Sequence, residues 1–146
     1  MFPTYTIDPG QRRVCITYSD QPTFAELKTV LEAIFLEPGY GRGFDFMIDR
    51  RTVREPASTA FAQQVADFMT SHPLEFTDAR WVVVVADTTN FGMARMIHGM
   101  AGIGLSGQVF YDRPSAERWL REGECVAHLA YVDTLRDEDT ASQAQA

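Results

Sequence analysis

The fold follows from residues 44–69, which read FDFMIDRRTVREPASTAFAQQVADFM. An apolar run that is too short for a typical helix ends at Asp49 and is followed by a charged loop. Phe61, Val65 and Phe68 then recur at the i, i+4, i+7 spacing of a buried helix face. The stretch therefore predicts a strand, a loop and an amphipathic helix. In a parallel sheet, the end of this strand and the start of this helix lie where open α/β sheets place ligand and partner sites.

The segments before this unit predict an antiparallel hairpin and a helix. Residues 5–7 and 13–19 are rich in β-forming side chains, and the sequence DPGQ at positions 8–11 suits a tight turn. The capping-box pattern TFAE then opens a helix that we predict over residues 23–36.

The segments after the unit continue the alternation of strands and helices. The sequence WVVVVA at 81–86 has no polar face, as expected of a strand covered on both sides. The other predicted elements are a helix at 90–100, a strand at 109–111 and a short helix near 114–120. The order is ββαβαβαβα, which predicts an α/β fold with a mixed, mostly parallel five-stranded sheet and helices packed against it.

Length and composition favour one domain. The chain has 146 residues, of which 45% are hydrophobic, and this suits a single core that we place in residues 1–122. Residues 123–132 are apolar enough to pack as a C-terminal extension. Residues 133–146 are polar, and we expect them to form a disordered tail.

Charge and cysteine content exclude several classes of protein. The formal net charge of −7 disfavours non-specific binding to nucleic acid. No apolar run reaches the ~18 residues of a membrane span and no signal-peptide pattern opens the chain, so we expect a soluble, cytoplasmic protein. Cys15 and Cys125 lie far apart without ligand spacing, and we expect no disulfide framework, no metal and no cofactor.

Two motifs resemble catalytic or nucleotide sites. Residues 102–107 match GxGxxG, but they leave a helix and enter a strand, the reverse of a dinucleotide site, so they predict a helix end and a turn. Asp49 and Asp87 close the two central strands, where carboxylates can serve acid–base or metal chemistry. No further clustered carboxylates accompany them, and an enzyme that uses this pair is the weakest alternative.

Positive charge is concentrated around the central strand in a chain that is otherwise acidic. Arg42, Arg50, Arg51 and Arg54 lie in the flanking loops, next to the N–H groups that begin the following helix. Such N–H groups and guanidinium groups both favour anions. We therefore predict an anion site at Arg50, Arg51 and Arg54.

The same stretch resembles the STAS domain family, the anti-sigma-factor antagonists and their relatives. In that family an apolar strand ends in an Asp, and a D-S-S-G motif starts the next helix, its first Ser being a phosphorylated switch. Here Asp49 takes the strand-end position, and residues 57–60, ASTA, fall where D-S-S-G would be, with Ser58 at the switch position. Alanines replace the motif's Asp and Gly. The resemblance covers roughly residues 4–122 and implies a STAS-like fold.

The resemblance and the residues together lead to one main hypothesis and two alternatives. The main one is a non-catalytic regulatory module that binds a protein partner near Asp49, Ser58 and Thr59 and through Met93 and Met96 of the neighbouring helix. The first alternative is a carrier of a small apolar ligand or lipid, because many Phe and Met residues in these two helices could line a cavity. The second is the enzyme described above. Homo-oligomer formation is left open.

Overall fold

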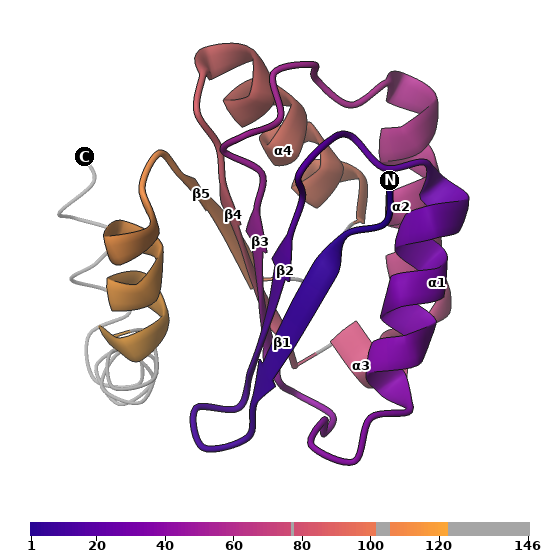
Figure 1. The fold of residues 1–146 in the computed structure, drawn as a ribbon, viewed down its shortest axis with the longest axis vertical. Coiled ribbons are helices and arrows are strands. Elements are labelled where there is room, and N and C mark those ends of the chain that lie inside the picture. Colours follow the sequence, from indigo (N-terminus) through magenta and orange to yellow (C-terminus); the bar gives the residue numbers. More distant parts are fainter. Residues whose placement is uncertain (77, 102–105, 123–146) are drawn as a thin grey trace, which may run out of the picture. The chain divides into compact units, whose positions relative to one another are not determined.

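The computed structural model describes residues 1–76, 78–101 and 106–122 (Figure 1). The chain divides into two compact units, Met1–Ala116 and Glu117–Ala146. The predictions for residues 123–132 and 133–146 lie outside the described residues. None of the described helices is long and apolar enough to cross a membrane.

The first unit contains a five-stranded sheet in which the strands lie in sequence order. The strands are β1 (Thr4–Asp8), β2 (Arg13–Thr17), β3 (Asp45–Asp49), β4 (Arg80–Val84) and β5 (Ser106–Phe110). β1 pairs antiparallel with β2, and the pairs β2–β3, β3–β4 and β4–β5 are all parallel. The predicted mixed, mostly parallel sheet is confirmed.

Helices alternate with the parallel strands, as predicted. They are α1 (Phe24–Phe35), α2 (Thr59–Ser71), α3 (Pro73–Phe76) and α4 (Thr88–Ala101), and residues 113–122 are also helical. α1, α2 and α4 lie on the same side of the sheet (Figure 1). The short helix α3 follows α2 directly, because Pro73 suits a first helical position and Phe76 is buried.

The predicted start of α1 is confirmed by its hydrogen bonds. The backbone N–H of Glu26 donates to Oγ1 of Thr23 at 3.2 Å, and the backbone N–H of Thr23 donates to Oε1 of Glu26 at 2.9 Å. This reciprocal capping box satisfies two N–H groups that have no partner within the helix.

The core lies between the helices and one face of the sheet. Side chains from β2, β3 and β4 on this face pack with the buried residues of α1 and α2. The rings of Phe46 and Trp81 stack there with their centroids 4.9 Å apart. Val83 and Val84 point to opposite faces of β4 and both are buried, as predicted for this strand.

α4 forms despite two glycines. Gly92 and Gly99 are exposed, and a Cβ added at either would meet no atom within 4 Å. α4 ends at Ala101 and β5 begins at Ser106, so the glycine run does leave a helix and enter a strand. Its residues 102–105 lie outside the described residues.

Candidate functional site

Ser58 caps α2. Its side-chain oxygen accepts a hydrogen bond of 3.0 Å from the backbone N–H of Phe61, and its own backbone is extended. Both Ser58 and Thr59, the first helical residue, are exposed. Ser58 was expected at or near the first turn of this helix; it is the residue immediately before that turn, and its hydroxyl is already used as a cap.

An open groove of about 420 Å³ lies beside this cap. Its walls come from three segments, residues 20–24, residues 55–58 and the first turns of α2. Asp20 and Glu55 bring carboxylates to the groove, and no arginine lines it. The groove next to Ser58 is therefore acidic rather than basic.

The arginines around β3 do not gather in one cluster, and the anion site predicted at Arg50, Arg51 and Arg54 stays a prediction. Arg42 precedes β3, whereas the other three follow it, at the opposite end of the strand. Arg50 extends into the helix-covered side of the sheet, and Arg51 pairs with Asp49. Arg54 is exposed, and its backbone oxygen accepts a hydrogen bond from Asn90. Side chains of successive residues in extended chain point to opposite faces, which separates Arg50 from Arg51.

Asp49 is held by arginines. Nε of Arg51 donates to Oδ1 of Asp49 at 3.0 Å and Nη2 of Arg51 donates to Oδ2 at 2.7 Å. Arg113 lies 4.0 Å from the same Oδ2. Burial alone would raise the pKa of Asp49, but the hydrogen bonds and charge of Arg51 lower this pKa below its ordinary value.

Asp87 has a different structural role. Its Oδ1 accepts from the backbone N–H of Asn90 at 2.8 Å, and both of its carboxylate oxygens lie 3.1 Å from Nδ2 of Asn90. These bonds cap α4 and lower the pKa of Asp87. Asp49 and Asp87 share no hydrogen-bonding partner among the interactions found in the described ranges.

Arg50 was the residue whose environment the sequence reasoning missed. Only 6% of its surface is exposed, although it was assigned to a charged loop. Its Nη2 donates to Oε1 of Gln21 at 2.8 Å, to Oδ1 of Asn90 at 2.9 Å and to the backbone oxygen of Glu55 at 3.4 Å. Its guanidinium also lies over the ring of Tyr18, 5.6 Å from the centroid. Continued strand alternation from Phe46 and Ile48 is the signal that could have placed it.

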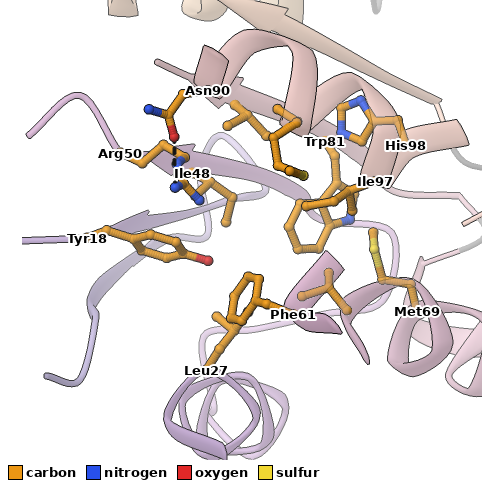
Figure 2. A pocket seen from close by; sticks show the side chains of 14 residues that line it. Tyr18, Leu27, Ile48, Arg50, Phe61, Met69, Trp81, Asn90, Ile97 and His98 are labelled. Atoms are coloured by element: carbon orange, nitrogen blue, oxygen red, sulfur yellow. Dashed lines mark hydrogen bonds between the residues drawn. The ribbon is translucent and has the colours of Figure 1, made fainter. Parts of the chain in front are cut away.

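Arg50 lines a small cavity between α2, α4 and the sheet (Figure 2). The cavity has a volume of about 40 Å³. Apolar side chains form most of its wall, among them Ile48, Phe61 and Met93. Met96, by contrast, is 37% exposed. The two methionines predicted to contact a partner therefore differ, because Met93 lines the interior and Met96 reaches the surface.

Three buried nitrogens in the wall of this cavity have no hydrogen-bonding partner in the described part of the chain. They are Nε of Arg50, Nε1 of Trp81 and Nε2 of His98. Burial lowers the pKa of His98, with a further contribution from Arg95, and both effects favour the neutral ring. Burial raises the pKa of Tyr18 to about 12, although Arg50 opposes this shift. The cavity thus combines apolar walls with unsatisfied polar atoms.

His98 fits against β5 because residue 107 is a glycine. A Cβ at Gly107 would lie 2.7 Å from Cε1 of the His98 ring, closer than real Cβ contacts allow. The ring therefore occupies the space that a side chain on β5 would otherwise fill.

In the ranges that the structure describes, no three His, Cys, Asp or Glu side chains gather as metal ligands would. Comparison of the chain with protein family models, with curated proteins and with solved structures finds no match.

Proposed function

We propose that the protein is a non-catalytic regulatory module, of the STAS-like kind, that binds a protein partner at the start of α2 and the neighbouring α4. The observation that carries this proposal is the open groove beside Ser58. Three chain segments meet there around an exposed helix start, and loops supported by a rigid scaffold are common sites of recognition.

The chemistry of the groove indicates the partner. Asp20 and Glu55 give it negative charge, which suits a partner segment that carries Lys or Arg. α2 packs directly against α4, and the exposed Met96 of α4 can add an apolar contact. A basic segment with an apolar side chain is therefore the partner that this surface fits best.

A catalytic use of Asp49 and Asp87 has less support. Asp49 accepts two hydrogen bonds from the side chain of Arg51, and Asp87 caps α4 through Asn90. Both carboxylates therefore have structural partners, and a general base or metal ligand would have to give these up.

Charge reversal in the groove tests the proposal. Proteins captured from the native host by the immobilised chain would be identified by mass spectrometry, and the affinity of each purified candidate would then be measured. Glu55→Arg should weaken a genuine partner at least tenfold because it places a positive charge in the binding groove. Glu32→Arg is the matched control, since Glu32 is exposed on α1, away from the groove residues. Equal binding by both variants would refute the proposed surface.

A further inference from the structure

The cavity between α2, α4 and the sheet carries a second inference, which is independent of the partner-binding surface. Polar atoms lie on two of its sides. Figure 2 shows Arg50 and Tyr18 on one side and Trp81 and His98 on the other, with apolar side chains between them. Buried polar atoms in native structures nearly always have partners, so unsatisfied ones around a shared space indicate an occupant.

The charge on Arg50 limits what this occupant can be. None of the ion pairs found in the described ranges involves Arg50. Its side-chain acceptors Gln21 and Asn90 are neutral amides, and the electrostatic interactions that favour its charged form come from Tyr18 and Asp87. A buried guanidinium with only neutral acceptors is incompletely compensated, and an anion beside it would supply the missing charge.

The available space limits the size of the anion. A cavity of about 40 Å³ holds roughly three or four water molecules at the ~10–15 Å³ that each requires. It is much smaller than the ~150 Å³ cavity that accommodates benzene. A lipid chain is therefore too large, and acetate is the acid that needs the least extra space. Butyrate has as many non-hydrogen atoms as benzene, so it fits only if Met69 and Met93 shift, as unbranched thioether side chains readily do.

We propose that this cavity binds a short-chain organic carboxylate, of the size of acetate to butyrate. Its carboxylate accepts a hydrogen bond from Nε of Arg50, and its carbons lie against Phe61 and Met93. Trp81 and His98, on the far side, offer hydrogen-bonding partners to a water bound beside the acid.

Entry of such a ligand requires one wall to move, and α4 is the wall best suited to this. Gly92 and Gly99 each lower its intrinsic helix stability relative to alanine. Asn90, Met93 and Ala94 of this helix line the cavity. Displacement of the helix would therefore open the cavity.

Titration of the full ¹⁵N-labelled chain, followed by NMR, tests the proposal. Millimolar butyrate should move the amide signal of Arg50 and the indole Nε1–H signal of Trp81, which the variant Trp81→Phe identifies. Butyramide has the same shape without the charge and should bind at least tenfold more weakly. Octanoate should bind no more tightly than butyrate, because the cavity is short.

Several outcomes would overturn the proposal. If no acid moves these signals, the cavity holds water only. Equal binding of butyrate and butyramide would show that Arg50 does not select an anion. A much higher affinity for octanoate would instead indicate a lipid carrier.

Two variants and one control locate the binding. Arg50→Met should reduce butyrate affinity at least tenfold, whereas Arg51→Met should not, because Arg51 is bound to Asp49 outside the cavity. Ala94→Val fills the cavity while keeping Arg50, and it should abolish butyrate binding. If Arg50→Met does not fold, Ala94→Val decides, and butyrate binding by this variant equal to that of the wild type would refute the site.

Discussion

Oδ1 of Asn90 accepts a hydrogen bond of 2.9 Å from Nη2 of Arg50, which joins the start of α4 to the end of β3 across 40 positions of sequence. Asn90 is itself oriented by Asp87, because both carboxylate oxygens of Asp87 accept from its Nδ2. Burial lowers the pKa of Arg50, and the negative charge of Asp87 partly opposes this shift, so the carboxylate that orients Asn90 also favours the charged guanidinium.

Replacing Asn90 with alanine should destabilise the protein by ~2–3 kcal/mol. The substitution removes an acceptor from a buried charged donor, and such hydrogen bonds contribute about 1.5–3 kcal/mol. It also removes the side-chain partner of Asp87. Urea unfolding of Asn90→Ala measures the loss, and Thr89→Ala, at an exposed position in the same helix, should change stability by less than ~0.5 kcal/mol. Similar values for the two variants would contradict the role assigned to Asn90.

Asp49 should make the protein sensitive to acid. Its folded pKa lies below its ordinary value of 3.8, so its ionised form favours the folded state. This contribution is complete above the unfolded pKa and is lost as the pH falls through the lowered folded pKa. When the free energy of unfolding is measured from pH 6 downward, Asp49→Asn should lose less of it below about pH 4 than the wild type does.

Arg51→Met provides the matched test of the cause. Arg51 supplies the hydrogen bonds and the main charge that lower the pKa of Asp49, so its removal should also reduce the acid sensitivity. If both variants lose as much stability below about pH 4 as the wild type does, other carboxylates govern this part of the pH profile.

The sequence predicted the elements well because their signals are local. The capping box at Thr23, the heptad-like spacing of Phe61, Val65 and Phe68, and the apolar run through Val83 each depend on neighbouring residues. Ser58 was placed correctly for the same reason, since a cap is recognised from the residues around it.

The environment of Arg50 could not be predicted in the same way. Its partners Gln21 and Asn90 lie 29 and 40 positions away, and only the folded chain brings them together. The pattern "charged residue after a strand" favours exposure, although strand alternation placed this side chain on the buried face. The sequence therefore did not reveal that Arg50, which lines the cavity, is buried apart from Arg51 and Arg54.

Gly107→Ala should destabilise the protein, because the new Cβ would lie 2.7–2.9 Å from three atoms of the His98 ring. Overpacking of this kind typically costs ~1–3 kcal/mol. Gly107→Ala should cost less stability when it is made in the His98→Ala variant than in the wild type, since the clashing ring is then absent. Gly92→Ala is the control and should stabilise the protein by up to ~1 kcal/mol, because it lies in open space within a helix. Additive effects of the substitutions at 107 and 98 would contradict the close packing of these two residues.

Substitutions at Ser58 distinguish a helix cap from a phosphorylated switch at the proposed partner surface. As a helix cap, Ser58→Ala should cost ~0.5–2 kcal/mol in urea unfolding, whereas Thr59→Ala should cost less than ~0.5 kcal/mol because its side chain is exposed. Ser58→Asp should fold normally, since a carboxylate also caps a helix and interacts favourably with its N-terminus.

A phosphorylated switch would make partner binding sensitive to the added charge. Asp20 and Glu55 already make this groove negative, so we expect a basic partner to bind wild type and Ser58→Asp with affinities within about threefold of each other. Loss of the partner with Ser58→Asp, but not with Ser58→Ala, would establish the switch instead.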